Sequence, residues 1–152
     1  MSRAPFQVLV FPFKFDKQEI LYCVLKRNNE TGGYWQVIAG GGEENETELE
    51  AAKREALEEA LIPPDCNFLK LNSMATIPVV NVSGFLWGPK LLVIPEYSFG
   101  VDVKNGSIKI STEHSDFKWL CYEEARKILK WDSNRNALWE LNYRLTHNLD
   151  SE

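Results

Sequence analysis

The sequence of 152 residues lacks the features of membrane proteins and of nucleic-acid-binding proteins. No stretch reaches the roughly 18–20 apolar residues that a helix needs to cross a bilayer. The N-terminal apolar run is broken by Pro12 and Lys14, and no small-residue cleavage site follows it. There is no basic stripe, because 22 acidic residues outnumber 17 lysines and arginines and the net charge is −5. We therefore expect a cytoplasmic protein with no membrane partner and no nucleic-acid partner.

Cysteine is also scarce. The three cysteines, Cys23, Cys66 and Cys121, are widely spaced and odd in number, which favours reduced thiols over a disulfide framework or a zinc site. No linker, internal repeat or low-complexity tract divides the chain, and its length is close to that of one typical domain. The sequence thus predicts a single domain over residues 1–152.

The order of apolar segments predicts a mixture of strands and helices, the α+β class. Residues 7–15 and 20–26 are expected to form a hairpin around the polar segment 16–19. Further strands are expected at 35–38, 69–80, 84–87, 91–99 and 117–120, with a flexible glycine segment at 40–42. Two helices are expected at 122–129 and 134–147, the second capped by Ser133 or Asp132.

An acidic run stands out in an otherwise balanced chain. Residues 43–59 contain eight glutamates against Lys53 and Arg54, a net charge of −6, while the rest of the chain carries +1. Like charges three or four residues apart on a helix repel each other by about 0.2–0.5 kcal/mol per pair. A bound cation would offset that repulsion, although a solvated acidic helix face is the simpler alternative.

The acidic run is expected to be helical. Thr47 and Glu50 have the spacing of a capping box, and Pro63 and Pro64 end the segment. The apolar residues expected to pack against a core are Leu49, Ala52, Ala56 and Leu57. At 3.6 residues per turn, Glu55, Glu58 and Glu59 share one face. Carboxylates on a rigid face suit Mg²⁺ or Mn²⁺, which prefer hard oxygen ligands together with substrate phosphates.

The same segment resembles the signature of the Nudix hydrolases. The residues in register with that signature are Gly40, Glu46, Arg54, Glu55, Glu58, Glu59 and Ile62. Two positions depart from it: Ala56 replaces an aliphatic residue, which affects helix packing, and Leu61 replaces a glycine, which affects the exit turn. The resemblance implies an αβα sandwich with a mixed sheet, and a divalent-metal-dependent hydrolase of phosphoanhydride bonds in small molecules.

The resemblance also implies roles for individual residues. The expected metal ligands are Glu55, Glu59 and Glu113, with Glu58 as a close neighbour. Glu58 or Glu113 would take the proton of the attacking water. Arg54 is the third residue of the catalytic group, and its expected role is to pair with Glu46 and so hold the site in place. Glu113 could instead be a surface residue of its loop, and His114 could either order that loop or be polar surface.

Further segments resemble the bacterial Nudix enzymes that hydrolyse dihydroneopterin triphosphate or dATP. These segments are Thr112-Glu113-His114, residues 117–120, Trp131, and Ser133-Asn134-Arg135. The residues expected to contact substrate are Arg27, Lys26, Gly40, Gly41, Asn134 and Arg135. Local pairing or surface charge is the alternative for the charged members and for Asn134, and core packing is the alternative for each tryptophan. Residues 72–77 and 79–85 are expected to shape the specificity pocket.

Two alternatives to this function stay open. A Nudix enzyme that acts on a dinucleoside polyphosphate, an oxidised nucleotide or a nucleotide sugar would have the same signature. A Nudix fold that binds a ligand without catalysis is the other alternative, but such proteins usually lose a glutamate of the signature, and all are present here. The sequence is compatible with a monomer or a homodimer.

Overall fold

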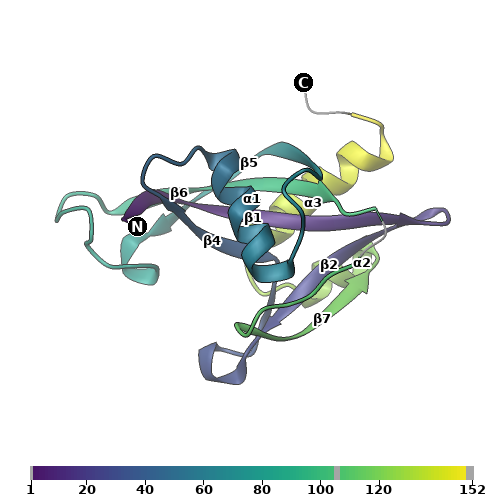
Figure 1. The fold of residues 1–152 in the computed structure, drawn as a ribbon, viewed down its shortest axis with the longest axis horizontal. Helices are drawn as coiled ribbons and strands as arrows, with labels where there is room; N and C mark the ends of the chain where they lie inside the picture. Colours follow the sequence, from purple (N-terminus) through teal and green to yellow (C-terminus); the bar gives the residue numbers. More distant parts are fainter. Residues whose placement is uncertain (1, 105–106, 150–152) are drawn as a thin grey trace.

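The computed structural model describes residues 2–104 and 107–149, and its core is one mixed sheet (Figure 1). Within the described residues the sheet has seven strands: β1 (Arg3–Asp16), β2 (Glu19–Arg27), β3 (Trp35–Gln36), β4 (Ile38–Glu43), β5 (Asn67–Pro78), β6 (Val93–Asp102) and β7 (His114–Leu120). The strand order is β3-β2-β1-β6-β5, with β4 paired to β1 and β7 paired to β2. β1 runs parallel to β6, which makes the sheet mixed.

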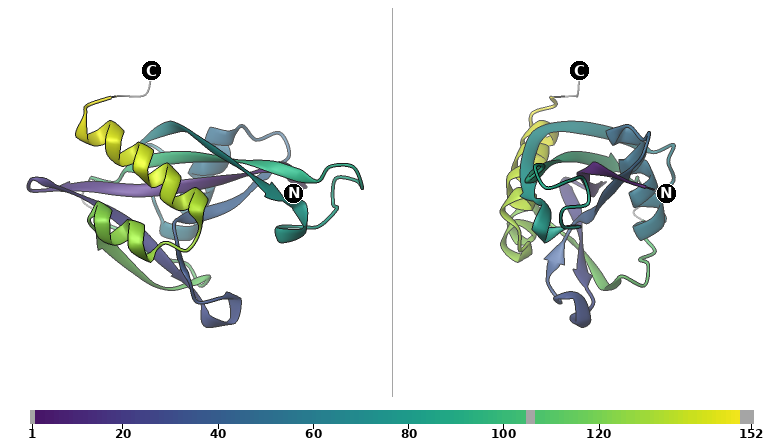
Figure 2. Two further views of the ribbon diagram at one scale, coloured as in Figure 1. Left: turned by 180° about the vertical axis from the view of Figure 1, so that it is seen from behind. Right: turned by 90° about the vertical axis from the view of Figure 1, so that its left-hand side faces the viewer.

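Helices cover both faces of the sheet. α1 (Glu48–Ala60) lies on one face, and α2 (Tyr122–Ile128) and α3 (Asp132–Thr146) lie on the other, as the front and back views show (Figures 1 and 2). The alternation along β1 explains the two cores. Val8 and Val10 pack beneath α1, whereas Leu9, Phe11 and Phe13 pack beneath α2 and α3. The α+β class and the αβα sandwich are therefore confirmed.

The hairpin between β1 and β2 forms where the sequence predicts it. Asp16 pairs with Glu19 across the turn, and Phe15, the last of three alternating phenylalanines, is exposed near this end. The predicted strand at 84–87 is wrong, because these residues form turns in the long connection between β5 and β6. None of the helices among the described residues is both long and apolar enough to cross a membrane.

α1 begins with the predicted capping box. Thr47 accepts a hydrogen bond from the Glu50 backbone N–H at 3.1 Å, and the Glu50 carboxylate accepts one from the Thr47 N–H at 2.8 Å. The buried apolar face consists of alanines, namely Ala51, Ala52, Ala56 and Ala60. Leu49 and Leu57, which were expected in the core, are exposed. Small side chains let the helix lie close to the sheet, and Ala56, at the position of the signature's aliphatic residue, is fully buried in the core.

The glycine segment is a strand rather than a flexible loop. The predicted strand at 35–38 is in fact split into β3 and β4, and Gly40 and Gly41 continue β4, paired with Val8 and Gln7 of β1. Glycine is required here by close approach. A Cβ on Gly40 would overlap the Glu55 carboxylate, and one on Gly41 would overlap the Arg3 guanidinium.

The C-terminal helices are close to their predicted bounds. α3 begins at Asp132, so Asp132 and Ser133 lie inside the helix and neither caps it. The capping position is held by Trp131, whose side chain makes no capping hydrogen bond. The three cysteines are free thiols, Cys23 buried and the other two half-buried, as predicted.

Candidate active site

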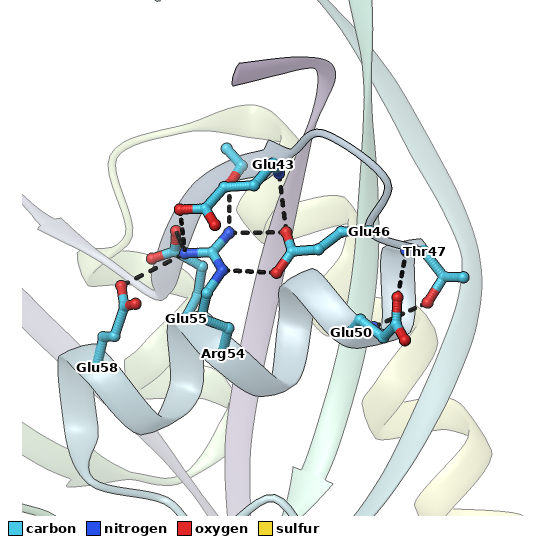
Figure 3. A network of polar contacts seen from close by, with 8 residues as sticks. Glu43, Glu46, Thr47, Glu50, Arg54, Glu55 and Glu58 are labelled. Atoms are coloured by element: carbon cyan, nitrogen blue, oxygen red, sulfur yellow. Dashed lines mark hydrogen bonds and ion pairs between the residues drawn. The ribbon is translucent and has the colours of Figure 1, made fainter. Parts of the chain in front are cut away.

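Arg54 on α1 is the centre of a polar network that joins the helix to the preceding loop and to β4 (Figure 3). Its Nε and Nη2 donate to the two carboxylate oxygens of Glu46 at 2.7 and 3.0 Å, and Nη2 also donates to the Gly41 carbonyl at 2.8 Å. Glu46 in turn accepts a hydrogen bond from the Glu43 backbone N–H at 2.8 Å. The hydrogen bond from Arg54 is the main reason why the pKa of Glu46 lies below its ordinary value. Arg54 thus holds the loop before α1 against the sheet.

The same guanidinium reaches the acidic face of the helix. Arg54 Nη1 lies 3.0 Å from Glu55 Oε2 and 3.4 Å from Glu58 Oε1 (Figure 3). A cation between two carboxylates weakens their mutual repulsion. The Arg54 guanidinium therefore offsets part of the repulsion between the glutamates of α1. This position suits the supporting role predicted for Arg54 and Glu46.

Glu55 and Glu59 form a buried acid pair. Each side chain affects the pKa of the other, and Glu59 is only 3% exposed on the face of α1 that packs on β4. Burial is the main cause that raises the pKa of both carboxyls, that of Glu59 to about 10. The backbone of Ala39 lowers the pKa of the Glu59 carboxyl, but the buried Oε1 of Glu59 has no hydrogen-bond partner among the described residues. A buried oxygen without a partner is costly, so this pair is suited to a cation.

The loop before β7 is held against the end of α1. Its Lys109 and Ser111 N–H groups donate to the carbonyls of Ala60 and Glu59, both at 3.1 Å. This brings Glu113 close enough for its charge to contribute to the raised pKa of Glu59. The Glu113 side chain is 56% exposed and its Oε1 lies 3.5 Å from Arg27 Nη1. The structure therefore brings Glu55, Glu58, Glu59 and Glu113 to one end of α1, two of them buried and two exposed.

The donor set can be compared with the needs of a divalent ion. Within residues 2–104 and 107–149, no three His, Cys, Asp or Glu side chains converge closely enough to form a complete metal cage. Glu58 and Glu113 point to arginines, and Glu55 and Glu59 form the pair with the free oxygen. Mg²⁺ usually takes one or two protein carboxylates and completes its shell with water and substrate phosphates. The residues present therefore fit such an ion.

The predicted substrate-contact residues divide into two groups. Arg27 lies beside Glu113, and Gly40 and Gly41 lie beneath Glu55 and Arg54. Arg135, in contrast, donates to the Leu129 and Lys130 carbonyls at 2.7 and 2.9 Å and pairs with Asp132, so its contacts are local. No ion pair connects Lys26 to an acid in the part of the chain that the structure describes.

A cavity of about 530 Å³ lies on the opposite side of the sheet from α1, a volume typical of small-ligand sites. Asn134 is among its lining residues and is buried there, where its Oδ1 accepts a hydrogen bond from the Val37 N–H at 3.1 Å. The segments 72–77 and 79–85, expected to shape a pocket, both contribute lining residues. Of the five tryptophans, Trp131 lines this cavity, in edge-to-face contact with Tyr34.

Two links join this cavity to the carboxylates. Ala39 lines the cavity, and its backbone lowers the pKa of the Glu59 carboxyl. Gln36 also lines the cavity, and its amide lies 3.5 Å from Nε2 of His114, the residue that follows Glu113. His114 is buried, so the alternative of a polar surface residue is wrong, and burial lowers its pKa. The cavity and the acid cluster are therefore parts of one region around β3 and β4.

Sequence reasoning missed three members of this region, Tyr34, Gln36 and Glu96. Glu96 is the residue for which a sequence signal exists, because it is the single acid in the apolar segment 91–99 that was predicted as a strand. Tyr34 and Gln36 give no comparable signal. Their importance follows from the pairing of β3 with β2 and from the cover that Trp131 provides.

Comparisons with known proteins agree with this architecture. The family model described as NUDIX domain matches residues 4–140. A crystal structure of a NUDIX hydrolase from Listeria monocytogenes is 41% identical, covers 98% of this chain and 99% of its own, and has a TM-score of 0.89. The dihydroneopterin triphosphate diphosphatase of Escherichia coli is 28% identical over 90% of this chain and 91% of its own. The solved E. coli dihydroneopterin triphosphate pyrophosphohydrolase is 25% identical, with coverage of 93% and 99% and a TM-score of 0.72.

The match of the family model covers most of the chain, and it includes the acid cluster on α1 and the Arg54 network. The Listeria structure extends the likeness over nearly the whole of both chains. The chain therefore belongs to the Nudix hydrolases, enzymes that generally use divalent metal ions to cleave phosphoanhydride bonds in small molecules.

Proposed function

We propose that the protein hydrolyses a pterin or deoxynucleoside triphosphate, dihydroneopterin triphosphate or dATP, to a monophosphate and pyrophosphate. The observation that carries the proposal is the buried Glu55–Glu59 pair with an oxygen that lacks a partner, beside a cavity large enough for a heterocyclic ring. The likeness to the E. coli dihydroneopterin triphosphate diphosphatase over 90% of the chain supports the substrate class. The proposal treats residues 1–152 as one catalytic domain that acts as a monomer or homodimer, without nucleic acid.

Glu55 and Glu59 would hold Mg²⁺, or Mn²⁺ in its place, with Glu113 as a third ligand and Glu58 beside them. The ion would neutralise charge on the phosphate oxygens and lower the pKa of water. Arg54 keeps Glu55 and Glu58 in place, and Arg27 is available for the phosphates when Glu113 turns away from it. Gly40 leaves room for the Glu55 carboxylate above β4.

The reaction needs an in-line water and an acceptor for its proton. The water oxygen forms a bond to the α-phosphorus, the bond to the bridging oxygen breaks, and pyrophosphate leaves. Glu58 or Glu113 accepts the proton, because both carboxylates are exposed at the end of α1, at 57% and 56% of their side chains.

The experiment is a turnover assay of the purified protein with Mg²⁺. The substrates are dihydroneopterin triphosphate, dATP, the other nucleoside triphosphates, diadenosine polyphosphates and nucleotide sugars, and pyrophosphate is separated from phosphate. We expect pyrophosphate to be released fastest from the pterin substrate or dATP. Fastest turnover of a diadenosine polyphosphate or a nucleotide sugar would refute the substrate class, and ligand-induced stabilisation without any turnover would indicate a binding module.

Variants test the site. Glu55→Gln and Glu59→Gln keep the shape of each side chain and are expected to lower turnover by at least about 100-fold, because a metal centre contributes several kcal/mol to the transition state. The matched control is Glu44→Gln, which removes one charge from the exposed part of the same acidic run. Near wild-type turnover of both site variants at saturating Mg²⁺, with the folded state intact, would show that the assignment is wrong.

A further inference from the structure

Glu96 is a buried acid on the cavity side of the sheet. It lies on β6, is 6% exposed, and stands between Gln7 of β1 and Ala75 of β5 in the strand register. All three residues line the cavity of about 530 Å³. A carboxyl in the middle of an apolar strand is rarely buried without a partner or a function.

The surroundings of Glu96 do not supply a cation. Ser133 at the start of α3 is the polar neighbour that affects its pKa, and no ion pair with Lys, Arg or His reaches it within the described residues. Burial raises the pKa of Glu96, and Ser133 opposes this rise. The carboxyl therefore has capacity to accept further hydrogen bonds from a molecule that enters the cavity.

The rest of the cavity suits a planar ring. Tyr34 and Trp131 form an aromatic wall, with ring centroids 5.2 Å apart and planes at 80°. Trp131 is 43% exposed, and Lys130 Nζ lies 5.3 Å from its ring centroid. Ala39 lines the cavity and its neighbour Gly40 lies under the Glu55 carboxylate, so the cavity and the acid cluster adjoin opposite faces of β4.

We propose that Glu96 selects rings that present a ring N–H next to an exocyclic amino group, as guanine and pterin do, over adenine. This inference rests on the proposed triphosphate hydrolysis and defines the substrate class of the same site. Hydrogen bonds donated to a carboxyl favour its ionised form, so a ring that offers two parallel N–H donors would hold Glu96 ionised against the effect of burial, with one donor for each oxygen. The corresponding edge of adenine has one amino donor beside an unprotonated ring nitrogen, which would face a carboxylate oxygen and repel it.

A preference for adenine would need one hydrogen-bond donor and one acceptor at this position. A neutral Glu96 would present one donor and one acceptor and would match adenine, and so would an amide at this position. Glu96→Gln therefore replaces one of the two acceptors of the ionised carboxylate by a donor while it keeps the volume of the side chain. This makes the amide variant a direct test of which ring edge the residue recognises.

Binding is measured by titration calorimetry with Mg²⁺ and the α,β-imido analogues of dGTP and dATP, which cannot release pyrophosphate by cleavage at that bond. We expect the wild-type protein to bind the guanine analogue at least about 10-fold more tightly than the adenine analogue, as for hydrogen bonds to a charged group. We expect Glu96→Gln to remove this preference, mainly by weaker binding of the guanine analogue. The matched control is Glu124→Gln, an exposed acid on α2, which should leave both affinities unchanged.

Equal affinities in the wild-type protein, a preference for the adenine analogue, or no binding of either would overturn the inference. The wild-type comparison needs no variant, so it stands even where Glu96→Gln does not fold. Because binding is read without turnover, a ring preference in a protein that hydrolyses nothing would support Glu96 recognition and refute only the proposed reaction. Turnover of dATP without any preference for guanine or pterin rings would support the proposed reaction and refute recognition by Glu96.

Discussion

Leu61 ends α1 in the left-handed region of backbone space, with φ 56° and ψ 36°, at the position where the family signature has glycine. Its N–H closes the helix by donating to the carbonyls of Ala56 and Leu57, while its side chain is 57% exposed. A side chain in this region costs roughly 1–2 kcal/mol, whereas glycine adopts it without strain. The departure from the signature is therefore accommodated by backbone strain rather than by a different turn.

The perturbation that isolates this strain is Leu61→Gly compared with Leu61→Ala, because both remove the leucine side chain. Glycine relieves the strain of roughly 1–2 kcal/mol that alanine keeps, but it loses about 0.5–1 kcal/mol more conformational entropy on folding. The glycine variant should therefore be more stable by about 0.5–1 kcal/mol. For a chain of this length that corresponds to a melting-temperature difference of about 1–4 °C.

The matched control is the same pair of changes at Leu57, inside α1 and similarly exposed. There glycine should be the less stable variant, by about 0.5–1 kcal/mol. Urea and thermal unfolding followed by circular dichroism give both differences. The reasoning would be refuted if Leu61→Gly were no more stable than Leu61→Ala while the Leu57 pair behaved as expected.

Three further predictions follow from the polar contacts of the described residues. Arg54→Lys cannot keep the bidentate pair with Glu46, so we expect a loss of about 2 kcal/mol of stability and a 10- to 100-fold lower turnover. Urea unfolding measures the first and the pyrophosphate assay the second. Unchanged stability would contradict the role of the network. Gly40→Ala would push against the Glu55 carboxylate, so turnover should fall together with the melting temperature, and normal turnover would show that the close approach is unimportant. Burial raises the pKa of Glu140, but the hydrogen bonds that its carboxylate accepts, mainly from the β5 segment, lower it further than burial raises it. A depressed folded-state pKa contributes stability above the unfolded value of about 4.3, and this contribution is lost as the pH falls through the folded-state pKa. Glu140→Gln should therefore be less stable than the wild type at pH 7, and the difference in melting temperature should shrink below pH 4; a difference independent of pH would contradict this.

Local spacing was sufficient to predict α1 and much of its chemistry. The capping box of Thr47 and Glu50, and the common face of Glu55 and Glu59, depend only on the repeat of a helix and on neighbours three or four residues apart. The period-2 alternation of β1 likewise predicts its strand, and the hairpin follows because the strand ends in a short polar turn. The resemblance to the family added Glu113, which no spacing within the helix reveals.

The sequence by itself determined the class of the fold, the acidic helix and the family, since these depend on periodicity and on residues at short separations. Only the tertiary structure decided that Glu59 is buried while Glu58 is exposed, that Gly40 is an element of a strand under Glu55, and that Glu96 lines a cavity. Each of these depends on contacts between β4, β6 and helices that are remote in the chain. The burial of a particular carboxyl, which also shifts its pKa, depends on such contacts and cannot be read from the periodicity of its own segment.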